Sequence, residues 1–180
     1  MPFAMRGCRK HNADSGDETA AGMVAVGDDA PEFSAPLANG EIDEFGLSAA
    51  LEEGPVVLAF FPGAFTSVCT GEMRTFRDRI ENLTTEGATL YGVSTDSPFA
   101  LNEFRDQNDL PFDLISDANK EIIDLYDVAF DFDAVGLEDL AKRAVFVVNT
   151  DGEVTYAWVS DDPGVEPDYE EVEAAATAAD

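Results

Sequence analysis

The sequence predicts an α/β protein that has a mixed central sheet, helices on both faces and an N-terminal β-hairpin. Two observations predict this class. Strands and helices alternate through the middle of the chain, a pattern typical of a sheet with parallel strands. A two-residue turn signal at Asn39-Gly40 and a turn at Asp151-Gly152 mark an antiparallel pair on either side of that region. We expect one domain over residues 23–180, preceded by a disordered tail over residues 1–22 that shows no hydrophobic periodicity.

The first half of the domain is expected to hold the hairpin, a short helix and a central strand. In chain order these lie at Phe33–Leu37 and Glu41–Phe45, at Leu47–Leu51 and at Val56–Phe61. The central strand reads VVLAFF, a continuous apolar run typical of a strand that is covered on both faces. Apolar residues then recur at spacings of three and four, which predicts one amphipathic helix containing Met73, Phe76, Ile80 and Leu83.

Two more strand–helix pairs, a second hairpin and a final helix are expected in the second half. The strands are placed at Thr89–Ser94, Phe112–Ile115, Ala144–Val148 and Glu153–Val159, and the helices at Phe99–Gln107, Glu121–Tyr126 and Tyr169–Ala178. Ser97 and Pro98 supply the N-cap and the first residue of a helix. Alternating strands and helices followed by an antiparallel pair predict a mixed sheet.

Charge excludes two classes of partner. The chain has 38 acidic and 10 basic residues and a net charge of -28. Such a chain repels nucleic acid and anionic membranes. The scarcity of lysine resembles proteins of salt-in halophilic archaea, because at about 1 M salt the Debye length is only about 3 Å and self-repulsion largely vanishes. An ordinary acidic protein is the alternative. The chain has neither a signal-peptide pattern nor an apolar run of membrane-spanning length, so we expect it in the cytoplasm.

Cysteine and histidine counts exclude several kinds of chemistry. With only Cys8 and Cys69 and no CxxC, a disulfide framework and a structural zinc site are ruled out. The one histidine, His11, lies in the tail, which excludes Ser-His-Asp and Cys-His catalysis from the domain. No nucleotide-binding glycine motif is present. We expect neither a cofactor nor a metal.

One acidic cluster has a weak likeness to a calcium loop. Asp127, Asp131 and Asp133 precede Gly136, but the twelve-residue pattern that ends in glutamate is not met. At this density of acids such clusters arise by chance. We interpret the segment as a solvated face.

The segment FFPGAFTSVCT, residues 60–70, carries the chemistry. It joins the buried strand to the amphipathic helix and places Cys69 in the first turn of that helix. Unpaired N–H groups and the helix dipole stabilise a thiolate there. A buried structural cysteine fits the local pattern equally well, so both interpretations stay open at this point.

Four residues carry a family resemblance. Pro62, Thr66 and Cys69 fit the spacing Pro-x-x-x-Thr-x-x-Cys, and Arg143 opens the strand RAVFVV before the last hairpin turn. This arrangement resembles peroxiredoxins over about residues 27–169. The ending YAWVSDDPGVEPDYEEV is similar to the subgroup of bacterioferritin-comigratory protein and one-cysteine alkyl hydroperoxide reductases. The resemblance implies a thioredoxin-like fold, reduction of hydrogen peroxide and organic hydroperoxides, and a homo-oligomer.

The resemblance also implies a role for each matched residue. Cys69 thiolate would attack the peroxide and become a sulfenic acid. Arg143 would hold the thiolate and bind peroxide oxygen, Thr66 would offer its hydroxyl to both, and Pro62 would shield the sulfur from water. The alternatives are a surface arginine, a threonine cap and a strand-ending proline. Glu72 can orient an arginine, but a solvated face is the favoured interpretation.

The second half of the catalytic cycle needs a reducing thiol. Relatives with a resolving cysteine in this helix have it five residues after the nucleophile, where this sequence has Arg74. Cys8 is the other cysteine. We therefore expect a one-cysteine enzyme that is reduced by an external thiol or a thioredoxin-like partner. The rival functions are a thiol–disulfide oxidoreductase, which the absence of CxxC disfavours, and a non-enzymatic redox sensor or holdase.

Overall fold

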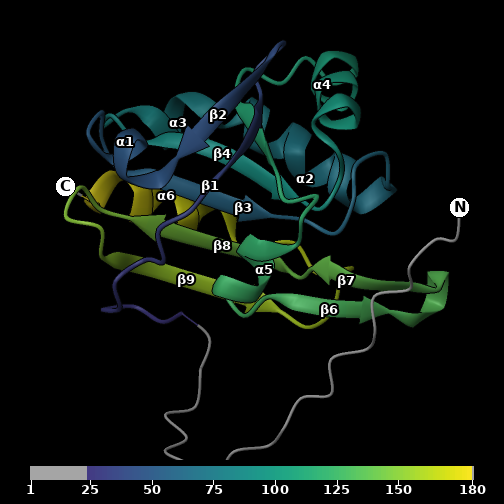
Figure 1. The fold of residues 1–180 in the computed structure, drawn as a ribbon. Coiled ribbons are helices and arrows are strands. Elements are labelled where there is room, and N and C mark those ends of the chain that lie inside the picture. The colour runs from purple at the N-terminus through teal and green to yellow at the C-terminus, as the bar shows by residue number, and fades with distance from the viewer. Residues whose placement is uncertain (1–23, 180) are drawn as a thin grey trace, which may run out of the picture.

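A seven-stranded mixed sheet forms the centre of the protein in a computed structural model that describes residues 24–179 (Figure 1). Its strands are, in sheet order, β2 (Ile42–Gly46), β1 (Ser34–Ala38), β5 (Asp113–Ser116), β4 (Thr89–Ser94), β3 (Val56–Phe60), β8 (Arg143–Val148) and β9 (Val154–Ser160). The three strands β3, β4 and β5 run parallel, and the other pairs are antiparallel. The predicted mixed sheet and N-terminal hairpin are confirmed.

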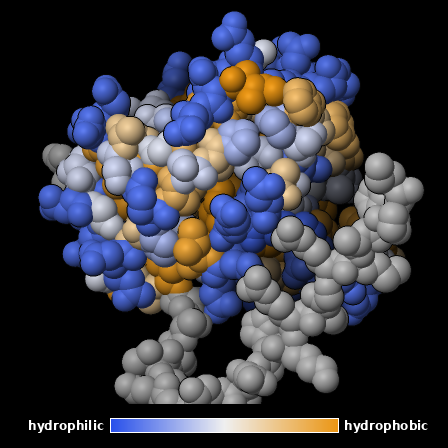
Figure 2. Space-filling view, in the orientation of Figure 1, coloured by the Kyte–Doolittle hydropathy of each residue, from blue (hydrophilic) through white to orange (hydrophobic). Residues whose placement is uncertain are grey.

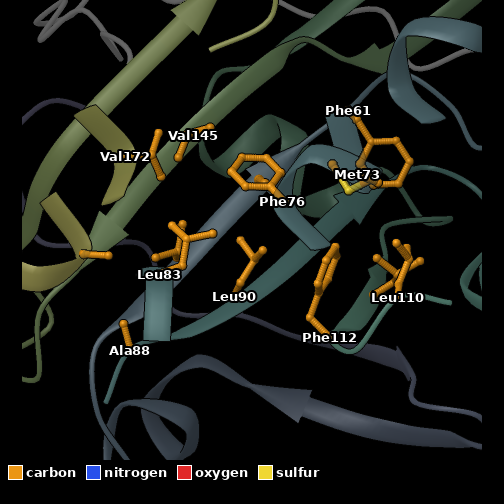
Figure 3. Close-up of a cluster of buried hydrophobic side chains, with 14 of the residues drawn as sticks. Phe61, Met73, Phe76, Leu83, Ala88, Leu90, Leu110, Phe112, Val145 and Val172 are labelled. Atoms are coloured by element: carbon orange, nitrogen blue, oxygen red, sulfur yellow. The ribbon is translucent and has the colours of Figure 1, made fainter. Parts of the chain in front are cut away.

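Helices cover both faces of this sheet, as predicted. They are α1 (Leu47–Leu51), α2 (Ser67–Asp78), α3 (Ile80–Thr84), α4 (Pro98–Gln107), α5 (Glu121–Leu125) and α6 (Tyr169–Ala178). One hydrophobic core lies between the sheet and α2, α3, α4 and α6, and Figure 3 shows part of it. A second core lies on the other face, under α1 and α5. All five side chains of β3 are buried and alternate between the two cores, which explains the unbroken apolar run.

The turn of the first hairpin differs from the prediction. Ala38 pairs with Ile42, so three residues rather than two connect the strands. Gly40 has a φ of 97°, and the Asn39 side chain accepts a hydrogen bond from the Glu41 N–H at 3.1 Å. Asn102 of α4 accepts from the Gly40 N–H at 2.9 Å and donates to the Glu41 carbonyl at 2.7 Å. This tertiary contact selects the longer loop.

The predicted amphipathic helix is divided in two. Its path breaks at Arg79, where φ is -105° and ψ is 7°, so α2 ends and α3 begins. Met73, Phe76 and Leu83 nevertheless bury in the same core. The apolar spacing therefore continues across the break, and the sequence pattern alone does not reveal it.

An additional hairpin occupies the segment that was interpreted as a solvated acidic face. Strands β6 (Ala129–Phe132) and β7 (Leu137–Ala141) pair antiparallel around the 3-10 turn η1 (Asp133–Val135) and extend beyond the main sheet (Figure 1). The three aspartates of the cluster are exposed, as expected, but the backbone is ordered as a hairpin. Within residues 24–179 no group of three or more potential ligands could hold a metal ion.

Some sequence predictions concern residues that the structure does not describe. The tail over residues 1–22, with Cys8 and His11, and the domain boundary at residue 23 are among them. Of the helices within residues 24–179, not one combines the length and the apolar composition that a membrane crossing needs.

Candidate active site

Sheet register brings the predicted site residues together. The chain leaves β3 at Phe60 and enters α2 at Ser67, so the motif forms the connecting loop. Strand β8 pairs antiparallel with β3, with Phe60 opposite Ala144. Because the start of β8 thus lies beside the end of β3, Arg143 reaches the loop that carries Cys69 although 74 residues separate them.

The Cys69 sulfur lies against a cation and a helix N-terminus. The Arg143 guanidinium donates a hydrogen bond from Nη2 to Sγ at 3.2 Å, and both residues are only 1% exposed. Cys69 is in the first turn of α2, before the first helical bond, which the Thr70 N–H donates to the Thr66 carbonyl at 2.9 Å. The N–H groups of that turn and the guanidinium stabilise negative charge on the sulfur.

Two further groups hold the Arg143 guanidinium in place. Nη1 donates to Glu72 Oε2 at 2.6 Å, while Nε and Nη2 donate to the Pro163 carbonyl at 3.1 Å and 2.8 Å. Pro163 follows β9, whose Ser160 pairs with Arg143. The guanidinium is therefore fixed in one plane by a carboxylate, a carbonyl and the sulfur.

The favoured interpretation of Glu72 as part of a solvated face is wrong. This side chain is fully buried, and its Oε1 has no hydrogen-bond partner among the residues that the structure describes. Its position three residues after Cys69 places it on the same face of α2, and that spacing is the signal that could have identified it. The Pro163 contact is made by a main-chain carbonyl and leaves no mark in the sequence.

Burial and charge act against each other in this ion pair. Burial raises the pKa of Glu72 to about 7, and the Arg143 charge opposes that rise. Burial alone would lower the pKa of Arg143. The neighbouring Glu72 and Cys69 have the larger, opposite effect, so the pKa of the guanidinium lies above its ordinary value. Arg143 therefore remains a cation in the site.

Thr66 and Pro62 line the same pocket as Cys69 and Arg143, so all four predicted site residues come together. Pro62 is buried and Thr66 is exposed. The Thr66 hydroxyl donates to the Gly63 carbonyl at 2.8 Å rather than to the sulfur. This bond fixes the loop immediately before α2.

An aspartate that was not predicted also holds the loop. Asp96 Oδ2 accepts hydrogen bonds from the Ala64 N–H at 2.8 Å and from the Ser94 hydroxyl at 2.7 Å. It follows β4, and the carboxyl ends of parallel strands meet at one edge of a sheet, which is the signal that could have found it. Phe65, in the same loop, has a φ of 67°, a conformation that non-glycine residues rarely adopt.

The pocket has a volume of about 470 Å³. Cys69 and Arg143 line it together with side chains of the β6–β7 hairpin and η1. Trp158 is half-buried against the first core and does not line this pocket.

Comparisons with known proteins agree with this geometry. The model of the AhpC/TSA family matches residues 26–157. A putative peroxiredoxin of Mycobacterium tuberculosis is 35% identical over 136 residues, which are 74% of this chain and 84% of the relative. Peroxiredoxin Bcp of Escherichia coli K12 is 30% identical over 136 residues, 75% of this chain and 85% of the relative.

A solved structure has the same fold. The crystal structure of peroxidoxin BcpB from Mycobacterium tuberculosis superposes with a TM-score of 0.74 at 29% identity, over 86% of this chain and 97% of that chain. Peroxiredoxins use peroxide substrates and thiol reductants. The chain therefore belongs to the AhpC/TSA family, has the thioredoxin-like fold of the peroxiredoxins and is a thiol-dependent peroxidase, an oxidoreductase.

Proposed function

We propose that Cys69 is the nucleophile that reduces hydrogen peroxide and organic hydroperoxides. The observation that carries this proposal is the 3.2 Å contact between the Cys69 sulfur and the Arg143 guanidinium in the pocket. The thiolate attacks the terminal peroxide oxygen, an S–O bond forms and the O–O bond breaks. Sulfur is oxidised to sulfenic acid, and the leaving oxygen takes a proton and departs as water or an alcohol.

The surrounding residues have distinct roles in this step. Arg143 holds the thiolate and meets the negative charge that develops on the peroxide oxygens. Thr66 shapes the loop through Gly63 and presents its hydroxyl oxygen to the pocket. Pro62 lines the same pocket as Cys69 and has no N–H group to hydrate, which limits the access of water. Glu72 positions Arg143 without contacting substrate.

We further propose a one-cysteine cycle. A thiol attacks the sulfenic acid and releases water, and a second thiol reduces the mixed disulfide to Cys69 and a new disulfide. Both thiols come from an external small molecule or from a thioredoxin-like partner. Arg74 supports this cycle, because it stands five residues after Cys69 and its exposed side chain donates to Asn108 at 2.8 Å.

Replacement of each cysteine tests the mechanism. Cys69→Ser should abolish peroxide turnover with dithiothreitol and keep the fold, because serine is nearly isosteric but a much poorer nucleophile. Cys8→Ser is the matched control and should keep turnover close to that of the wild type. Peroxide-treated wild type should carry one added oxygen on Cys69 by intact-mass spectrometry, and excess peroxide should add more.

Two results would contradict this proposal. Turnover that survives in Cys69→Ser would remove Cys69 as the nucleophile. A non-reduced mass two hydrogens lighter, absent in Cys8→Ser, would show a Cys8–Cys69 disulfide and replace the one-cysteine cycle.

Assembly, location and origin remain predictions. We propose a homo-oligomer, which family membership supports, and light scattering tests it. Strand β9 offers a surface for it at one end of the sheet, because six of its seven residues are partly exposed. The cytoplasmic location and the halophilic archaeal origin rest on composition alone.

A further inference from the structure

We propose that the β6–β7 hairpin makes this enzyme select uncharged, apolar organic hydroperoxides over hydrogen peroxide and over anionic hydroperoxides. The inference deepens the proposed function and rests on Cys69 as the nucleophile. Three observations carry it: the size of the pocket, the apolar hairpin residues that line it together with Cys69, and the acidic residues on the same hairpin.

The pocket is larger than hydrogen peroxide requires. Its volume is about 470 Å³. A water molecule occupies about 30 Å³ of liquid, so a peroxide with two oxygen atoms fills only a small part of the pocket. Cavities of roughly 300–1,000 Å³ typically hold ligands with a substantial organic group. The pocket therefore has room for a substituent on the peroxide.

The wall that the hairpin contributes to the pocket is apolar. It includes Phe132 of β6, Val135 of η1, and Leu137 and Leu140 of β7. Val135 is 57% exposed and Leu137 is 52% exposed, so both present apolar surface that a ligand can cover. Most of the face drawn in Figure 2 is hydrophilic, with smaller apolar patches between the charged side chains. Apolar surface beside a reactive group marks a binding site, and an organic substituent that covers it gains affinity.

The hairpin is fixed well enough to act as a wall. Lys120 Nζ donates to the Glu138 carbonyl at 3.0 Å, which ties β7 to the residue before α5. The Asp139 N–H donates to Asp131 Oδ1 at 3.1 Å across the two strands. Gly136 closes η1 with a φ of 70°. The peroxide group at Cys69 and the substituent at the hairpin thus have fixed relative positions.

Charge near the wall disfavours an anionic substrate. Asp133 and Glu138 are exposed on the hairpin, and Asp96 lines the pocket. Arg143 is the single basic residue among the described lining residues, and it is already bound to Glu72, Pro163 and Cys69. Lys142, its neighbour in sequence, is paired with Asp161 at 2.8 Å. A substrate carboxylate that entered the pocket would lose its hydrating water molecules without gaining a cationic partner.

Selectivity ratios test the apolar wall. The ratio of kcat/KM for cumene hydroperoxide to kcat/KM for hydrogen peroxide is measured in the wild type and in Val135→Ser and Leu137→Ser. We expect the ratio to favour cumene hydroperoxide in the wild type and to fall about tenfold in each variant, because a polar side chain replaces apolar contact. Leu125→Ser is the control, since Leu125 is 47% exposed on α5 and does not line the pocket.

A matched substrate pair tests the charge. Linoleic acid hydroperoxide and its methyl ester share one chain and differ in one carboxylate. We expect the wild type to prefer the ester at least tenfold. The double variant Asp133→Asn/Glu138→Gln should narrow that preference, and Glu86→Gln, an exposed acid remote in sequence, should not.

Each other outcome overturns the inference. A cumene-to-hydrogen-peroxide ratio that is the same in the wild type and both hairpin variants shows that the hairpin does not contact the substituent. Equal rates with the acid and the ester remove the charge selection. A change in assembly of Val135→Ser or Leu137→Ser, measured by light scattering, shows instead an interface between two copies. Peroxide turnover in Cys69→Ser would contradict Cys69 as the nucleophile. Failure of the proposed function is therefore distinguishable from failure of the selectivity inference.

Discussion

Arg143 connects three parts of the site, because its one planar side chain donates hydrogen bonds to Cys69, Glu72 and the Pro163 carbonyl. We expect Arg143→Ala to slow sulfenic acid formation by about 10²–10³, since it removes a charge-assisted donor that acts at the transition state. Arg143→Lys should restore only part of the rate, because an ammonium group cannot reproduce the fork. Rapid-mixing kinetics with hydrogen peroxide measures this step.

Thermal unfolding of both Arg143 variants controls for loss of the fold. A rate for Arg143→Ala within twofold of the wild type would remove Arg143 from the peroxide step. Full recovery of the rate of sulfenic acid formation in Arg143→Lys would show that a positive charge alone is sufficient for this step.

Glu72 is expected to make the free energy of unfolding depend on pH. Burial raises its pKa from the ordinary value of 4.5 to about 7, so between these pH values the folded protein binds more protons than the unfolded chain. Stability should therefore fall as pH rises through that window, and the full cost, on the order of a few kcal/mol, should be present above about pH 7. Glu72→Gln should flatten this part of the profile.

Urea unfolding in molar KCl from pH 4.5 to 8 measures the difference between the wild type and Glu72→Gln. If the two profiles run parallel across the window, Glu72 does not titrate there. The peroxide-step rate of the same variant reports separately on how well Arg143 is positioned.

The four site residues were predicted from the resemblance to peroxiredoxins, and the structure places all four at one pocket, while their catalytic roles stay predictions. Glu72 could not be predicted with the same security, because one acid among 38 carries no distinguishing mark until its burial is known. The Pro163 carbonyl could not be predicted at all, since any residue supplies one. Main-chain contacts depend on where β9 ends and how the chain turns back.

At the scale of elements, Asp117 determines where α5 begins. Its Oδ1 accepts from the N–H groups of Glu121 at 2.9 Å and Ile122 at 3.0 Å, and its Oδ2 accepts from Ile123 at 2.9 Å. Asp117→Asn keeps one acceptor oxygen and turns an NH₂ group towards a backbone donor. We expect a loss of about 1–2 kcal/mol in the free energy of unfolding.

Asp124→Asn is the matched control for this prediction, because Asp124 is exposed on the same helix. Urea unfolding in molar KCl compares the two variants. Equal stability of Asp117→Asn and Asp124→Asn would show that the forked contact contributes little.

Three elements were predicted with the bounds that the structure shows, and one predicted helix cap is present. The bounds of α1, β4 and α6 agree with the sequence prediction, and the Ser97 hydroxyl accepts from the Ala100 N–H at 3.2 Å, as its N-cap position implies. The β6–β7 hairpin was missed because its strands mix acids with apolar residues and only its base reaches a core, where Ala141 is buried and Ala129 packs. Phe132, Leu137 and Leu140 line the pocket instead, so the hairpin as a whole follows no simple burial pattern.

At the scale of the whole molecule, charge governs when the chain folds. With a net charge of -28, we expect folding to require roughly molar salt and to fail near 0.1 M, where the Debye length is about 10 Å and self-repulsion acts between neighbouring side chains. Circular dichroism over a KCl series measures this. A cooperative native melt in dilute buffer would refute it.

Sucrose serves as the control for the salt series. It favours compact states by exclusion from the protein surface but does not screen charge. Recovery of the fold in KCl and not in sucrose would assign the effect to screening. The fold class itself was predictable without considering net charge, because the order of strands and helices specifies the mixed sheet.

The pairing of β3 with β8 has a consequence for biosynthesis. Cys69 is translated 74 residues before Arg143. At about 5–20 residues per second, roughly 4 to 15 s pass between the two. During that interval the cysteine lacks the neighbouring guanidinium that we propose activates it. We therefore expect the nascent thiol to react with peroxide more slowly than the folded site, which is complete only when β8 pairs with β3.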